Sequence, residues 1–298
     1  MNTAFKRPTL LIVGCGDIGL RVLRLLAPRW RVFALTSQAS RRQLLRDAGA
    51  VPLVGNLDEP ATLWRLGGLA DAVLHLAPPD AEGSAARDDP RTRHLLRALA
   101  RGGRVRRLVY ASTSGVYGDC GGERFDETRP VRPTTARAWR RVDAEAQVRL
   151  FGRQTGAAVS ILRIPGIYAA DRPGHPRERL LRGTPALLDE DDVYTNHVHA
   201  DDLARACVAA LLRGAPRRVY HACDEGELKM GQYFDLAADL CGLPRPRRIS
   251  REQAREELSP LLLSFMSESR RLDNRRLRQE LRLRLRYPTV REGLSAAP

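Results

Sequence analysis

Three glycines near the start of the chain have a spacing suited to binding a phosphate. Gly14, Gly16 and Gly19 form the pattern G-x-G-x-x-G between an apolar run and a helix-like stretch. The first glycine permits a tight turn, the second lets backbone approach a pyrophosphate, and the third lets helix and strand pack closely. The helix N-terminus adds N–H donors. We expect dinucleotide binding, rather than a purely structural turn, at Gly14, Cys15, Gly16, Asp17, Ile18 and Gly19.

The stretch after the second apolar run bears on the choice of dinucleotide. An Asp or Glu about 20 residues beyond the loop would hold the ribose 2′-hydroxyl of NAD. Here the sequence is ALTSQASRR, with the hydroxyls of Thr36 and Ser37 followed by Arg41 and Arg42. These side chains suit a 2′-phosphate better, so we expect NADP to be preferred to NAD. In the alternative, both arginines face water on the next helix.

A second group of chemically capable residues lies in ARAWRRVDAEAQ, residues 136–147. Arg137, Arg141 and Glu145 are spaced four residues apart, so on a helix they share one face. That face is either a solvated charged stripe or the working face of a site. Apolar residues at helical spacing beside it predict a helix that packs on the core.

These residues need a framework of strands and helices to position them. Strands are expected at 9–13, 31–35, 50–54, 71–77, 104–112 and 158–164. Helices are expected at 18–28, 40–48, 60–66, 88–101 and 136–155, then near 200–213, 229–241 and 251–258. Strands alternating with helices indicate βαβ units and a parallel sheet. We predict a doubly wound α/β Rossmann-type domain at 1–169 and a smaller, partly interleaved C-terminal substrate lobe at 170–298.

Composition limits the class of protein further. The chain of 298 residues has no apolar run of about 18, and its N-terminal apolar run is too short for a signal peptide. Five scattered cysteines without a C-x-x-C pair fit reduced thiols rather than a disulfide frame or a metal site. We expect a cytoplasmic protein with no membrane partner and no bound metal.

The net charge of +15 raises the question of a nucleic-acid partner. Such partners are bound by clustered cations that neutralise phosphates. The arginines here are instead spread along the whole chain, and only Lys6 and Lys229 are lysines. We interpret the charge as an arginine-rich surface and expect no nucleic-acid partner.

Several further motifs, taken with the glycine loop, resemble those of one enzyme superfamily. They are LHLAPP at 74–79, YASTSGVYGD at 110–119, FDETRP at 125–130, LRIPGIY at 162–168 and VHADDLA at 198–204. In this order they make the chain similar to the extended and atypical short-chain dehydrogenases/reductases, above all to the NAD(P)-dependent epimerase/dehydratase group. The resemblance implies a sheet that binds NAD(P) and a C-terminal lobe that binds the substrate, often a nucleotide sugar.

The resemblance also implies roles for residues outside the glycine loop. Thr113 falls on the Ser/Thr that hydrogen-bonds the reacting oxygen. Further cofactor contacts are implied at Asn56, which stands where an Asp is usual, and at Leu57, Leu76, Ala77, Pro78, Ser112 and Pro165. The alternative for residues 112–114 is a polar strand end that makes local backbone hydrogen bonds.

The helix at 136–155 departs from the family pattern. That pattern is Y-x-x-x-K with a Glu four residues later, and aligning the Glu on Glu145 places Arg141 at the Lys position and Arg137 at the Tyr position. In the family the Tyr transfers a proton, while the Lys lowers its pKa and holds the nicotinamide ribose. Arg141 can hold a ribose, but an arginine stays protonated and cannot exchange a proton near neutral pH. Tyr117 and Tyr168 are the candidates for a replacement acid.

A second departure concerns the substrate. Several sugar-nucleotide enzymes of the family carry an arginine just before the I-H-V-x-D segment, where this chain has Thr195 in YTNHVHADD. This difference argues against a nucleotide-sugar substrate. We interpret His199 and Asp202 of that segment as local hydrogen-bonding residues, and His75 as a histidine at the edge of the core, rather than as metal ligands.

Two functions follow from these residues. The first is an NAD(P)-dependent oxidoreductase or epimerase-type enzyme that transfers hydride to or from a small hydroxylated or sugar-like substrate. The alternative is a dinucleotide-binding sensor or scaffold that kept the fold and lost the chemistry. The missing Tyr and Lys favour the alternative, whereas Thr113 and the lobe motifs favour the enzyme. The partner expected is a small molecule, and the chain is expected to be a monomer or a homodimer.

Overall fold

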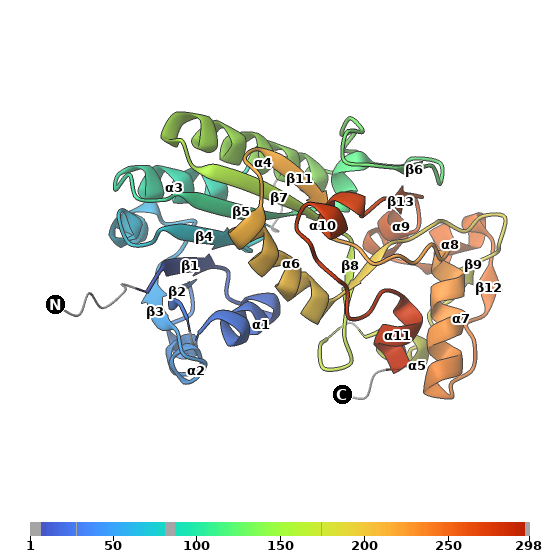
Figure 1. The fold of residues 1–298 in the computed structure, drawn as a ribbon. Helices are drawn as coiled ribbons and strands as arrows, with labels where there is room; N and C mark the ends of the chain where they lie inside the picture. The colour runs from blue at the N-terminus through green and yellow to red at the C-terminus, as the bar shows by residue number, and fades with distance from the viewer. Residues whose placement is uncertain (1–6, 28, 81–86, 174, 296–298) are drawn as a thin grey trace.

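A parallel sheet of seven strands lies at the centre of the computed structural model, which describes residues 7–27, 29–80, 87–173 and 175–295. The strand order is β11-β7-β5-β4-β1-β2-β3 (Figure 1). The strands are β1 (Thr9–Val13), β2 (Arg31–Thr36), β3 (Val51–Val54), β4 (Ala72–His75), β5 (Arg107–Thr113), β7 (Ala158–Ile164) and β11 (Arg218–His221). The order reverses between β1 and β4, and ligands of such sheets bind at this switch point, beyond the carboxyl ends of the strands.

Helices cover both faces of the sheet, because alternate residues of each strand point to opposite sides. In β1, Leu10 and Ile12 join one apolar cluster, whereas Leu11 and Val13 join the other. The first cluster is covered by α1 (Asp17–Leu26), α2 (Arg42–Asp47) and α6 (Ala200–Arg213). The second is covered by α3 (Pro90–Ala100), α4 (Ala136–Thr155) and the 3-10 helix η2 (Pro60–Leu66). Both faces are therefore buried, as the predicted fold class requires.

The predicted α/β fold is confirmed, and the six predicted strands are present with shifts of a few residues at their ends. The strand β11 was not predicted. It pairs with β7, with Arg218 opposite Ser160, and the helix that precedes it, α6, packs on α1. Residues 200–221 thus complete the Rossmann layers from within the half assigned to the lobe, while the exact boundary of that lobe stays a prediction.

The remaining segments build the smaller region at the carboxyl edge of the sheet, on the right in Figure 1. Three short parallel pairs lie there: β8 (Gly166–Tyr168) with β10 (His197–His199), β9 (Ala186–Leu187) with β12 (Arg248–Ile249), and β6 (Arg124–Phe125) with β13 (Arg271–Leu272). Its helices are α5 (Pro176–Leu181), α7 (Met230–Cys241), α8 (Arg251–Glu257), α9 (Pro260–Phe265) and α11 (Val290–Ser295), whereas α10 (Arg275–Gln279) packs on β11 and adds Leu277 to the core of the sheet. None of the helices in the described ranges has the length and apolarity needed to cross a bilayer.

A buried ion pair ties α4 to the ends of two central strands. The Glu145 carboxylate accepts hydrogen bonds from Arg163 Nε and Nη2 at 3.0 and 2.7 Å, and from Ser112 Oγ at 2.7 Å. Both charged side chains are 5% exposed. Ser112 lies near the end of β5 and Arg163 near the end of β7, so this carboxylate fixes both strand ends against α4.

The pair continues into a buried chain of hydrogen bonds. Arg163 Nη1 donates to the Tyr117 hydroxyl at 2.6 Å, and that hydroxyl lies 2.6 Å from His221 Nε2. Burial lowers the pKa of His221 to about 3, so its ring is neutral near pH 7. Its Nδ1 faces the Asp273 carbonyl at 2.9 Å and must therefore carry the proton. It follows that the Tyr117 O–H donates to Nε2.

Removing one partner of the Glu145–Arg163 pair should destabilise the fold. Glu145→Gln would leave a buried guanidinium without its counter-charge, and such losses cost about 3–5 kcal/mol. Urea denaturation should show this decrease in the free energy of unfolding. Arg153→Gln, on the exposed side of the same helix, is the control and should change it little. A Glu145→Gln variant as stable as the parent would show that the pair does not hold α4.

Candidate active site

The three glycines of the loop meet different surroundings. Gly14 has a φ of +81°, and a Cβ there would lie 2.5 Å from the Ala77 amide nitrogen. At Gly19 a Cβ would come within 3.0 Å of Cys15 Sγ, where helix and strand pack together. A Cβ on Gly16 would meet nothing within 4 Å. Of the three glycines in the loop, only Gly16 therefore faces open space, and this is where the motif requires room for a pyrophosphate.

The N-terminus of α1 opens onto the same space. Gly16 is its N-cap, and no side chain caps the first turn. The free amides and the positive end of the helix dipole suit an anion. The side chain of Asp17 is not available there, because Oδ1 accepts a hydrogen bond from Arg21 Nε at 3.0 Å. Ile18, also on α1, packs against the apolar core.

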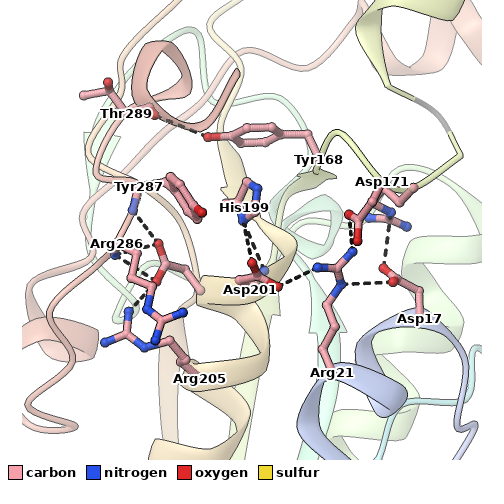
Figure 2. Close-up of polar contacts among 12 residues, drawn as sticks. Asp17, Arg21, Tyr168, Asp171, His199, Asp201, Arg205, Arg286, Tyr287 and Thr289 are labelled. Carbon is pink, nitrogen blue, oxygen red and sulfur yellow. Dashed lines mark hydrogen bonds and ion pairs between the residues drawn. The ribbon is translucent and has the colours of Figure 1, made fainter. Parts of the chain in front are cut away.

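Arg21 joins this helix to α6 and to the segment after β8, as Figure 2 shows. Besides Asp17, its guanidinium donates to Asp201 at the start of α6 and to Asp171 beyond β8, each at 2.5 Å. Burial alone would lower the pKa of Arg21, but the three carboxylates outweigh it and raise the pKa. The glycine-loop helix is thus held by ion pairs to the start of α6 and to the segment after β8.

A cleft of about 230 Å³ runs from the glycine loop over the ends of β1, β2 and β4. Its walls include nine of the residues predicted to contact the cofactor: Gly14, Cys15, Thr36, Ser37, Arg41, Asn56, Leu57, Ala77 and Pro78. Five other predicted contacts, Asp17, Ile18, Gly19, Leu76 and Ser112, and the open-facing Gly16 are not among its lining residues. Arg91, which the sequence analysis missed, also lines it and pairs with Asp58 at 2.7 and 2.6 Å.

Arg41 is the cation without a partner in this cleft. Within the part of the chain that the structure describes, its guanidinium makes no hydrogen bond and no ion pair. Thr36 Oγ1 accepts from the Gln38 amide at 3.2 Å and shapes the turn beside it. Arg42, at the start of α2, is exposed and lies outside the cleft wall. Of the two predicted arginines, only Arg41 reaches the cleft.

A second cavity, of about 390 Å³, lies between the sheet edge and the smaller region. Its wall on the sheet side is formed by Thr113, the last residue of β5, by Pro165, directly after β7, and by Arg137 of α4. Thr113 Oγ1 accepts a hydrogen bond from the Gly115 amide at 3.2 Å, so its O–H is free to donate into the cavity. Ser112 points the other way, to Glu145. The structure thus separates these neighbouring hydroxyls.

The two arginines of α4 have different surroundings. Arg137 lines the cavity, with its Cζ 4.9 Å from the centre of the Phe265 ring. Arg141 Nη1 donates to the Ala111 carbonyl at 2.6 Å and to the Tyr110 hydroxyl at 3.1 Å. Its Nε and Nη2 make no hydrogen bond to the described residues. Arg141 is therefore anchored to β5 by one nitrogen, and it lines neither the cleft nor the cavity.

Neither candidate for a replacement acid has a free hydroxyl. The Tyr117 hydroxyl lies in the buried chain between Arg163 and His221, and burial raises its pKa to about 12. Tyr168 lines the cavity, but its hydroxyl donates to the Thr289 carbonyl at 3.3 Å (Figure 2). Burial also raises the pKa of Tyr168. Neither geometry suits proton exchange with a molecule in the cavity near neutral pH.

The three residues interpreted as structural make internal contacts. His199 Nδ1 caps α6 by accepting from the Asp201 amide at 3.2 Å. The Asp202 carboxylate accepts from the amides of residues 286 and 287 at 2.8 to 2.9 Å. His75 Nε2 lies 2.9 Å from Thr92 Oγ1 in the core. These contacts agree with the structural interpretation.

Several cavity residues were missed by the sequence analysis. They are contributed mainly by α5, α7 and the segment before β13, and include Arg179, His197, Tyr233, Phe234 and Arg270. The sequence offers no signal for them. Arg179 stands in PRERLLR among other arginines, and Tyr233 and Phe234 are ordinary apolar residues of a predicted helix. Thr195, at the position where the resemblance implies an arginine, also lines the cavity.

Comparison with known proteins agrees with this geometry. The chain is 28% identical over 159 residues to dTDP-D-glucose 4,6-dehydratase of Homo sapiens, covering 50% of this chain and 44% of the relative. It is 29% identical over 232 residues to dTDP-4-dehydrorhamnose reductase of Mycobacterium tuberculosis, covering 72% and 73%. The chain thus spans about half the length of the first curated relatives and more of the reductase.

A solved structure resembles the whole chain. It is a conserved protein of unknown function from Silicibacter pomeroyi, 31% identical, with a TM-score of 0.78 and 97% of each chain covered. The model of the NAD dependent epimerase/dehydratase family matches residues 10–223. That match includes the glycine loop, the cleft and the sheet wall of the cavity. The chain belongs to the NAD dependent epimerase/dehydratase family.

Proposed function

We propose that this protein is an NAD(P)-dependent oxidoreductase that transfers hydride to or from a small hydroxylated or sugar-like substrate in the cavity beside Thr113. The observation that carries the proposal is the open space at Gly16, in front of the uncapped α1 and next to the cleft. The names of two relatives, a dTDP-glucose dehydratase and a dTDP-dehydrorhamnose reductase, favour a sugar-like substrate.

NADP is the preferred cofactor in this proposal. The pyrophosphate would be held by the loop at Gly14–Gly16 and the first amides of α1, and the adenosine by the cleft. Arg41 ends the short 3-10 helix Ala39–Arg41 that follows β2, and no described residue pairs with its guanidinium. A 2′-phosphate bound there would supply the missing counter-charge. The carboxylate that would favour NAD at this position is absent from ALTSQASRR.

In this proposal the chemistry is divided among Thr113 and Arg137, which line the cavity, and Arg141, which lies behind its wall on α4. The bound cofactor supplies a hydride donor or acceptor. Thr113 donates its free O–H to the reacting oxygen and so orients it. Arg141, anchored through Nη1, offers Nε and Nη2 to the nicotinamide ribose. Arg137 stabilises negative charge at the cavity but cannot exchange a proton.

A non-catalytic sensor is the second candidate. The observation that favours it is the anchoring of Arg141 to the Ala111 carbonyl and the Tyr110 hydroxyl, which a structural residue would also show. In either function the protein binds a small molecule. A cytoplasmic location and a monomeric or homodimeric state stay predictions from the sequence.

Gly16→Val should abolish NADPH binding and leave the fold intact. The new side chain would fill the space in front of α1, where no protein atom lies within 4 Å of its Cβ. Gly19→Val is the contrast and should lower the melting temperature, since its Cβ would crowd Cys15 Sγ. NADPH fluorescence titration and thermal denaturation measure the two effects. Normal NADPH affinity in Gly16→Val would contradict the loop assignment.

The preference for NADP should depend on Arg41. Calorimetry is expected to show tighter binding of NADPH than of NADH, and Arg41→Ala should narrow the gap by removing a charge-assisted hydrogen bond worth about 1.5–3 kcal/mol. Arg42→Ala should have a smaller effect, because Arg42 lies outside the cleft wall. Arg46→Ala, exposed on the same helix, is the control. Equal affinities for the two cofactors in the parent protein would refute the preference.

Oxidation of bound NADPH by an added substrate distinguishes the enzyme proposal from the sensor proposal. Small keto sugars and keto acids are added in turn to the NADPH-bound protein, and loss of the nicotinamide absorbance is expected with at least one. Thr113→Val should slow that reaction by roughly 100-fold, the usual loss for a donor to the reacting oxygen, with unchanged NADPH affinity. Tight NADPH binding without oxidation by any compound would favour the sensor.

A further inference from the structure

Arg179 occupies an unusual position in the wall of the substrate cavity. It belongs to α5, and its side chain reaches α7, where Cζ lies 4.3 Å from the centre of the Phe234 ring. Its Nη1 is 4.0 Å from Met230 Sδ, a weak acceptor. The guanidinium is therefore stacked on an aromatic ring and a thioether at the edge of the cavity.

This guanidinium has no counter-charge in the described part of the chain. Its Nε and Nη2 are shielded from solvent and have no hydrogen-bond partner, and no carboxylate forms an ion pair with it. Two buried arginines elsewhere in the chain are neutralised, Arg163 by Glu145 and Arg21 by three aspartates. Arg270, in the same cavity, pairs with Glu268 at 2.7 Å. Arg179 is thus left as a desolvated cation.

Arg179 remains protonated at pH 7 although it is shielded from water. Burial lowers its pKa to about 10, the nearby Tyr233 partly opposes that decrease, and Arg182 adds to it. The group is still a cation at pH 7. His197, which stacks on Tyr233 at 4.0 Å, is neutral near that pH because burial lowers its pKa to about 3. The α5 wall of the cavity therefore carries a positive charge, that of Arg179, which no described residue neutralises.

Leaving a cation unpaired and shielded from water is unfavourable, whereas a bound anion would supply both charge and acceptors. We propose that Arg179 binds an anionic group of the substrate, a carboxylate or a phosphate, and so acts as a specificity-determining residue. This inference rests on the proposed function, because it places the anion in the same cavity as Thr113. The substrate class is then a hydroxy or keto compound with an anionic group. Thr113 would contact its reacting oxygen, and Arg179 would contact its anionic group.

The position of the arginine supports a site particular to this chain. The resemblance implies an anion-binding arginine at the position of Thr195, which is uncharged. Arg179 lies on another element, α5, and not beside Thr195 in the sequence. Arg137 also lines the cavity, but it is exposed, so solvent screens its charge. The anion should therefore prefer the α5 wall.

Anion binding can be tested without knowing the substrate. In a Gly16→Val background, which removes the phosphate site of the loop, calorimetry is performed with inorganic phosphate and, separately, with succinate. At least one of the two should bind. Adding Arg179→Gln should weaken that binding at least tenfold, and Arg179→Lys should restore part of it. Arg177→Gln, exposed on the same helix, is the matched control and should have no effect.

Stability gives a second measurement that a structural arginine would not reproduce. Because Arg179 is an unpaired cation, Arg179→Gln should leave the melting temperature unchanged or raise it, whereas loss of a structural contact would lower it. Binding of neither anion, or equal binding in Arg179→Gln and its parent, would overturn the proposal. NADPH affinity is measured in parallel with Gly16 intact. If the protein binds no NADPH but still binds an anion through Arg179, only the proposed function is contradicted.

Discussion

The position of the cavity depends on one buried carboxylate. Glu145 joins α4 to Ser112 on β5 and to Arg163 on β7, one residue before Thr113 and two before Pro165. Both cavity residues are therefore placed by contacts made outside the cavity. The helix is held to the sheet by this carboxylate and also by Arg141, which donates to the Ala111 carbonyl. The contacts of Glu145 themselves involve neither of the positions at which the family resemblance implies Tyr and Lys.

The many arginines of this chain have three different uses. Arg163 and Arg21 are buried with carboxylates and hold segments together. Others, such as Arg245 with Asp239, form exposed pairs that contribute little to stability. Arg41 and Arg179 face the cleft and the cavity without a partner among the described residues. The net charge of +15 alone cannot distinguish these uses, because it counts charges without their surroundings.

The sheet was largely predictable because strands buried on both faces read as short apolar runs between helices. β11 was missed because it has only four residues, RVYH, one of them charged, and lies in the half assigned to the lobe. Only its pairing with β7 identifies it as a strand. Nine of the residues predicted to contact the cofactor do line one cleft, because they follow directly from the ends of predicted strands. The far wall of the cavity was not, because α5 and α7 carry no motif.

What the sequence determined by itself is local. The spacing of Gly14, Gly16 and Gly19 sets a turn whose conformation depends on neighbouring backbone, so the loop could be located before the fold was known. The tertiary structure alone decided which charges are paired. Arg21 pairs with Asp201 from 180 positions away, while no carboxylate in the described part of the chain pairs with Arg179. A long side chain takes its partner from whatever segment the fold brings beside it, and that choice leaves no periodic trace in the sequence.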